Sequence, residues 1–188
     1  MAVQAGRHHF STDRDRIVLR TSRDGMAAQA GHDLTIEATR WSGELTIGAG
    51  LAPTALEVRV DMGALIVREG TGGLKPLTDR DRREIGATAR KLLATDRNPE
   101  AVFIATKFEP DAGGGGIISG TFTLRGVERP IQLTVSKAGP DRYRATGSVV
   151  QSAYGIKPYS AFLGALKVRD AVDIEADIDL SELAEAPA

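Results

Sequence analysis

Three histidines are the side chains best suited to acid–base or metal chemistry in this 188-residue chain, because it contains no cysteine. The missing thiols exclude disulfides, cysteine-ligated metals and a cysteine nucleophile. His8 and His9 are adjacent, and neighbouring side chains of an extended segment point to opposite sides, so they do not together chelate one ion. We therefore expect no metal and no cofactor.

The third histidine, His32, precedes Asp33. A carboxylate can orient an imidazole for base catalysis, so one hypothesis is an enzyme that uses this pair on a hydrophobic substrate. Such a pair at a strand start is more often a hydrogen-bonded structural feature. The chain has no Gly-x-Ser-x-Gly, His-Glu-x-x-His or calcium-loop motif, so we expect it not to be an enzyme.

Two glycine-rich segments could in principle hold phosphate. In Gly70–Lys75 the lysine is followed by Pro76 rather than Ser or Thr, which favours a connection before a helix over a phosphate loop. Gly113–Gly116 is typical of a hairpin loop.

The charge balance and the hydropathy of the chain indicate which partners and which cellular location to expect. Lys and Arg number 24 against 25 Asp and Glu, and aromatic residues are not interleaved with basic ones, so we expect no nucleic-acid partner. No uncharged apolar stretch reaches the roughly 18–20 residues of an integral membrane segment. The first ten residues lack the pattern of a secretory signal, so a cytoplasmic location is expected unless a leader has been removed.

Alternating apolar and polar residues predict strands with one buried face. The length favours a single domain, 1–188, with an ordered core of about 10–180. Two segments, Ala101–Glu109 and Ile117–Leu124, are partly apolar on both faces, so alternation leaves their inward face open. The clearest alternating strands are Leu34–Ala38, Leu56–Met62, Ile131–Val135 and Val172–Leu180.

One helix is expected between Thr78 and Asp96. Thr78 is placed as its N-cap, Ile85, Ala89, Leu92 and Leu93 recur at helical spacing, and Asn98-Pro99 ends it. The segment Phe122–Ile131 reads as a hairpin with Gly126 in the turn and Pro130 at the start of the second strand. Strands separated by turns favour a barrel or sandwich.

A closed antiparallel barrel of about eight strands has an interior that is filled by side chains or holds one ligand. An apolar lumen favours alkyl or isoprenoid chains by about 0.8 kcal/mol per buried methylene. The same side chains could instead fill a solid core. Arg125, Arg129 and Lys157 are candidates for binding a polar head group. The predicted ligand-binding residues are Leu34, Ile36, Val58, Val60, Phe103, Ile104, Phe122, Leu124, Tyr154 and Phe162, with Phe103 and Ile104 as alternatives for the two phases of their strand.

Several short motifs resemble the YceI-like family. They are Gly31–Leu34, Trp41–Gly43, Asn98–Phe103, Gly120–Pro130 and Ser152–Ile156, in family order between about Phe10 and Leu180. The resemblance implies a mainly β fold, a single antiparallel lipocalin-like β-barrel with one helical insertion, which binds a polyisoprenoid or similar amphiphile. Many family members are exported. The chain departs from the family at Gln151, where an arginine often stands.

These observations predict a non-enzymatic carrier or sequestering protein for an isoprenoid or fatty-acyl lipid, with the lipid tail inside the barrel. The alternative is a stress-associated interaction scaffold with a packed barrel, whose outer surface or helix, including Leu92 and Leu93, meets a partner. A homodimer could form through a barrel edge or the acidic last strand.

Overall fold

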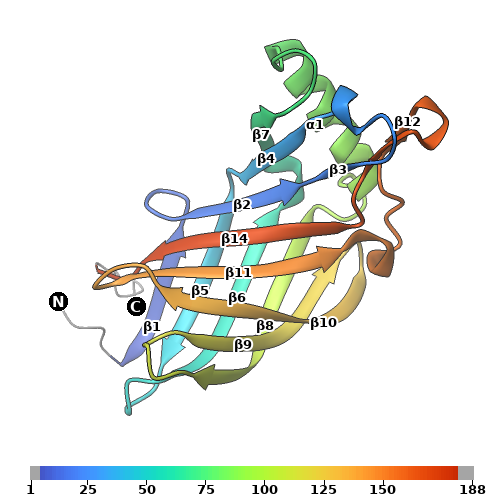
Figure 1. Ribbon diagram of the computed structural model, residues 1–188. Coiled ribbons are helices and arrows are strands. Elements are labelled where there is room, and N and C mark those ends of the chain that lie inside the picture. The colour runs from blue at the N-terminus through green and yellow to red at the C-terminus, as the bar shows by residue number, and fades with distance from the viewer. Residues whose placement is uncertain (1–4, 182–188) are drawn as a thin grey trace.

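The computed structural model describes residues 5–181, and most of them belong to one curled antiparallel sheet (Figure 1). The expected mainly β architecture with one α-helix is confirmed. The order of the eleven strands is β1-β5-β6-β8-β9-β10-β11-β14-β2-β4-β7, and β12-β13-β3 form a small second sheet. The strands are β1 (Gly6–Ser11), β2 (Arg16–Thr21), β3 (Arg23–Asp24), β4 (Asp33–Ala38), β5 (Trp41–Ile47), β6 (Pro53–Asp61), β7 (Leu65–Thr71), β8 (Glu100–Pro110), β9 (Gly116–Leu124), β10 (Val127–Lys137), β11 (Arg142–Val150), β12 (Ser160–Ala161), β13 (Leu166–Val168) and β14 (Ala171–Asp179).

A bent hairpin brings the two ends of the large sheet together. Strands β4 and β5 are separated by two residues, and β6 and β7 by a 3₁₀ turn, η2 (Met62–Ala64). The β5–β6 half pairs into one end of the sheet, and β4–β7 lies at the other. At the bend, the Asp61 amide donates to the Arg40 carbonyl at 3.0 Å, and the Thr39 amide to the Ala64 carbonyl at 2.9 Å. The sheet therefore curls around an interior.

The helix α1 (Asp79–Leu93) lies against β7 at one end of this curled sheet (Figure 1). Thr78 is its N-cap, as predicted: the Thr78 Oγ1 accepts from the Asp81 amide, and the Asp81 carboxylate accepts from the Thr78 amide at 2.8 Å. The helix ends at Leu93, before the predicted boundary, because Ala94 adopts a left-handed conformation and its amide turns back to the carbonyls of the last turn.

The hairpin between β9 and β10 has the predicted turn. Arg125 and Gly126 both have positive φ angles, 52° and 73°, as a two-residue type I′ turn requires. The prediction that Pro130 starts a strand is wrong, since β10 begins at Val127. Pro130 is tolerated inside β10 because β11 pairs with that strand at Thr134–Lys137, beyond the proline.

A bulge in β8 reverses the alternation of the strand part-way along its length. Ala105 pairs with Gly120 and Lys107 with Ser119, which leaves Thr106 as the extra residue. One extra residue reverses the alternation, so Phe108, opposite Ile118, faces the same side as Phe103. Ile104 points outward and is 48% exposed.

At the β1–β5 end of the large sheet, the interior is filled by aromatic packing, which we call the packed end (Phe10, Trp41, Gly43 and Ile47). The Phe10 and Trp41 ring centroids lie 6.1 Å apart, and both side chains are buried. Phe10 lies directly over its cross-strand partner Gly43, where a Cβ atom would come within 1.9 Å of the ring. Glycine is therefore required there for the ring to fit.

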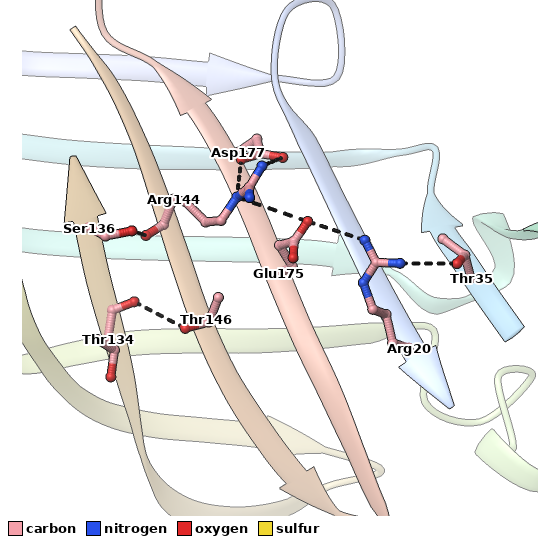
Figure 2. Close-up of polar contacts among 8 residues, drawn as sticks. All are labelled: Arg20, Thr35, Thr134, Ser136, Arg144, Thr146, Glu175 and Asp177. Carbon is pink, nitrogen blue, oxygen red and sulfur yellow. Dashed lines mark hydrogen bonds and ion pairs between the residues drawn. The ribbon is translucent and has the colours of Figure 1, made fainter. Parts of the chain in front are cut away.

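The outer face carries a ladder of charged side chains across β11, β14 and β2 (Figure 2). Arg144 donates to Asp177 at 2.8 Å and lies 4.0 Å from Glu175. Arg20 donates to Glu175 at 3.3 Å and to Thr35 at 3.2 Å. These side chains keep the outer face polar while apolar side chains of the same strands point inward.

Of the helices in the described chain, none is long and apolar enough to cross a membrane.

Candidate functional site

A cavity of about 570 Å³ lies between the inner face of the sheet and α1. Its walls are mostly aliphatic and aromatic, because alternate residues of the surrounding strands point inward. Strands β2 and β14 contribute Leu19 and Ile174, which the residue choice from sequence missed although they follow the same alternation. Seven of the ten predicted residues line this cavity: Leu34, Ile36, Val58, Val60, Phe103, Phe122 and Leu124.

The apolar face of α1 forms one wall. Ile85, Ala89, Leu92 and Leu93 all line the cavity. The scaffold hypothesis expected Leu92 and Leu93 on an exposed surface for a partner, but both are partly buried and packed against the core. The residues that recur at helical spacing in the sequence therefore form the face of α1 that lines the cavity.

The three remaining predicted residues, one of which was the alternative to Phe103, do not line the cavity. Ile104 is on the outer face because the alternation of β8 runs through Phe103. Phe162 is 68% exposed in the turn η4 (Phe162–Gly164). Tyr154, in the turn η3 (Gln151–Tyr154), is buried behind Phe122, with ring centroids 5.8 Å apart.

Tyr154 is held in an apolar setting. Burial raises the pKa of its hydroxyl above the usual value, and the hydroxyl has no hydrogen-bond partner within the described chain. Tyr154 therefore supports the wall of the cavity from behind, through its contact with Phe122.

Polar side chains gather at the α1 end of the cavity. Arg23 donates to the Gly31 carbonyl at 2.8 Å and lies 3.8 Å from the Asp33 carboxylate. Hydrogen bonds from Thr78 lower the pKa of the Asp81 carboxyl, so it is ionised at neutral pH. Lys167 makes no ion pair with any other residue between 5 and 181. The interior of the cavity is thus mostly apolar, and charged side chains lie at its α1 end.

His32 and Asp33 have separate partners. The His32 Nε2 lies 2.8 Å from the Lys75 carbonyl, which can only accept, so this nitrogen carries the proton. The Asp33 carboxylate accepts from the Arg23 amide at 2.8 Å. In the described chain no hydrogen bond or ion pair joins the two side chains, and each fastens a loop at the cavity rim.

The predicted head-group residues lie outside the cavity lining. Arg125 donates to the Gly155 carbonyl at 2.5 Å, and Arg129 to the Glu128 carbonyl at 2.9 Å. Lys157 lies in a neighbouring surface hollow. Sequence reasoning missed Arg23 and Lys167 as the basic residues of the cavity, because only the fold brings β3 and β13 to its rim.

The two glycine-rich segments form loops, and neighbouring groups pack against them or accept hydrogen bonds from them. Side chains of Arg23 and His32 press against Gly72 and Gly73, where a Cβ atom would come within 2.4 Å of them. In the β8–β9 loop, the Gly113 and Gly115 amides donate to the Asp111 carboxylate, as expected for a hairpin. No three His, Asp or Glu side chains among residues 5–181 converge to hold a metal ion.

The sequence matches the YceI-like domain over residues 17–180, most of the chain. The protein belongs to the YceI-like family. The family motif at Ser152–Gly155 fastens η3 to the barrel in this chain: Ser152 donates to Asp170 through its amide and its hydroxyl, and Gly155 adopts a positive φ of 69°. Gln151, the departure from the family, lines the cavity and donates to the Arg169 carbonyl at 2.9 Å.

Solved structures share the fold of this YceI-like protein at low identity. BcnA of Burkholderia cenocepacia is 13% identical, with a TM-score of 0.60 over 87% of this chain and 94% of BcnA. A mutant of the Campylobacter jejuni YCEI protein with a monobromobimane guest is 14% identical, with a TM-score of 0.54 over 78% of this chain and 85% of that one. A search of curated proteins finds no match.

Proposed function

We propose that this YceI-like protein binds a long-chain amphiphilic lipid, of the polyisoprenoid or fatty-acyl class, as a non-catalytic carrier or sequestering protein. The observation that carries the proposal is the apolar cavity of about 570 Å³ enclosed by the sheet and α1. Its volume is typical of small-molecule sites, which measure about 300–1,000 Å³. An apolar tail gains about 0.8 kcal/mol per buried methylene there, and no reacting group is needed.

The charged groups at the rim support a definite orientation. Arg23, Lys167, Asp81 and Glu84 lie at the α1 end, and the remaining wall is mostly apolar. Burying a charged head among aliphatic side chains would be costly, so the tail enters first and the head remains at the rim.

The presence of this cavity favours lipid binding over the alternative of an interaction scaffold with a packed barrel. In a solid barrel, Val58, Val60 and Phe122 would be in contact with opposing side chains, whereas here they border open volume. His32 and Asp33 each bond to a different backbone group rather than to one another, so they give no positive support to catalysis.

A series of prenyl and acyl chains of increasing length tests the proposal, with binding followed by isothermal titration calorimetry. The affinity should rise about fourfold per added methylene until the chain fills the cavity, and then level off. Native mass spectrometry of protein purified from its own cells would identify the resident lipid. Failure of every chain length to bind would overturn the proposal.

A matched pair of helix variants locates the site. Ala89→Phe places a ring in the cavity and should abolish binding of long chains, since Ala89 lines it. Ala87→Phe is the control, because two residues along a helix turn the side chain to the opposite side. Equal binding by both variants would place the lipid elsewhere.

A further inference from the structure

The turn that joins β12 to β13 exposes two large apolar side chains at its apex. Phe162 is 68% exposed, and Leu163 is fully exposed. Both have left-handed backbones, with φ angles of 49° and 53°. Left-handed positions usually take glycine or asparagine, so these residues combine backbone strain with unfavourable exposure to water.

A second loop adds a third apolar side chain beside them. Met26 is 97% exposed, and its loop is bonded to the η4 turn through the Ala27 amide, which donates to the Ala165 carbonyl at 2.8 Å. Both loops lie at the end of the barrel that holds α1 (Figure 1). We call Met26, Phe162 and Leu163 the apolar tip.

Cations surround the hollow beneath the tip. Lys157, Lys167 and Arg169 line it together with Leu163, and none of the three is ion-paired within residues 5–181. The hollow also holds two acids, which accept hydrogen bonds from neutral donors and so keep their charge: Asp24 accepts from the Gly25 amide, and Asp170 from Ser152. Three cations against two carboxylates leave the lining with a net charge of +1, which complements an anionic surface.

The hollow also adjoins the lipid cavity. Leu92, Tyr159, Lys167 and Val168 line both. Anything that the tip contacts therefore faces the rim through which an amphiphile would pass.

We propose that the apolar tip docks the protein on an anionic lipid bilayer, with Phe162, Leu163 and Met26 inserted among the head groups. The lipid then passes between bilayer and cavity without crossing open water, a step that rests on the proposed lipid-binding function. The geometry favours a membrane over a protein partner, because three side chains on a convex apex offer little of the roughly 1,000 Å² that a specific protein interface buries. Apolar side chains combined with cations are the usual composition of segments that lie in the membrane interface.

Sedimentation with vesicles tests the docking step directly. The protein should bind vesicles of phosphatidylglycerol more tightly than vesicles of phosphatidylcholine, by about fivefold for each cation that reaches the surface, and added salt should reduce the difference. The double variant Phe162→Ser, Leu163→Ser should lose at least tenfold in vesicle binding.

Leu51→Ser is the matched control. Leu51 is also an exposed leucine with a left-handed backbone, φ 57°, but it lies in the β5–β6 turn, which leads into the packed end of the barrel. It should leave vesicle binding unchanged. Equal vesicle binding by the wild type and the double variant, or equal loss in Leu51→Ser, would overturn the proposal.

A second measurement separates docking from lipid binding itself. The double variant should bind a short, water-soluble prenyl alcohol normally but extract a fluorescent polyprenyl lipid from vesicles at least tenfold more slowly. Loss of binding to the short alcohol in the double variant would make the tip part of the lipid site and overturn the docking proposal. Failure of the wild type to bind any prenyl lipid would sink the proposed function, while vesicle sedimentation would still decide docking. A concentration-dependent dimer that the double variant abolishes would assign the tip to a second copy instead.

Discussion

Inward-pointing side chains are densely packed in one region of the barrel and border open volume in another. At the packed end, Phe10 and Trp41 are buried and in contact, with Gly43 giving room for the ring. Around the cavity, Phe103 and Phe122 border open volume. One region fills the sheet interior and the other leaves it available, although both are built from alternating strands of one sheet.

This difference separates stability from binding. Dense packing contributes dispersion and hydrophobic energy, whereas side chains around an open cavity forfeit part of that contact. We therefore expect the packed end to stabilise the fold and the cavity to bind the lipid.

Truncation of one phenylalanine in each region gives the largest expected effect. Phe10→Ala should cost about 3–5 kcal/mol in the free energy of unfolding, because it opens a void in a packed region, and should leave lipid affinity nearly unchanged. Phe122→Ala should cost about 1.5–3 kcal/mol, because its ring is already in contact with open volume on one side, and should weaken lipid binding. Urea denaturation and calorimetry on both variants measure these losses. Similar stability losses with similar affinity losses would erase the distinction between the two regions.

Adding a single methyl group probes the tightness of the packed end. Gly43→Ala places a Cβ atom within 1.9 Å of the Phe10 ring and should destabilise the protein by about 1–3 kcal/mol through overpacking. Gly50→Ala, in a turn with nothing within 4 Å of the added atom, is the control and should stay within about 0.5 kcal/mol of the wild type. A neutral Gly43→Ala would mean that Phe10 can move aside.

Acid should loosen the α1 end through the helix cap. The folded-state pKa of Asp81 is lowered by its hydrogen bonds to Thr78, so the cap contributes fully above the ordinary carboxyl pKa, and its contribution is lost as pH falls through the lowered value. Thr78→Ala, which removes the cap, should cost about 1 kcal/mol at neutral pH. The protection factors of the α1 amides, which compare each exchange rate with the intrinsic rate at the same pH, should fall in acid for the wild type and depend less on pH in Asp81→Asn. Earlier opening of the Phe10 region would contradict this order.

The smallest effect is expected on the outer face, which both regions share. Arg144→Ala removes one member of the charged ladder with Asp177 and Glu175 (Figure 2). Exposed ion pairs contribute little and are screened by salt. Thermal unfolding should show a slight loss of stability that disappears at high ionic strength, with lipid affinity unchanged. A change in lipid affinity would show that the outer ladder influences the cavity.

The alternation of apolar and polar residues predicted most of the inner wall. Because side chains of a strand point to its two faces in turn, the orientation of one residue fixes that of the whole strand. It placed Leu34, Val58 and Leu124 correctly, and the helical spacing of Ile85 and Ala89 correctly predicted one face of α1. In β8 the outward Ile104 is as apolar as the inward Phe103, and the bulge at Thr106 gives Phe108 the opposite sequence phase to Phe103, so the phase of this strand stayed open.

The remaining misplacements come from tertiary structure. Phe162 is apolar and near a turn, and only the position of β12 and β13 outside the large sheet shows that it is exposed. Arg23 and Lys167 are distant in sequence and meet the same rim because β3 pairs with β13. Local patterns cannot reveal such pairings.

The pairing of β14 with β2 constrains how the protein is made. Ile174 lies opposite Leu19, so one of the first strands to leave the ribosome waits for the last strand of the barrel. Contacts this far apart in sequence slow folding and leave strand edges unpaired in the meantime. The cavity therefore closes only after β14 has been made, and a nascent chain that stops before Ala171 would present the edges of β2 and β11 to other chains or to chaperones.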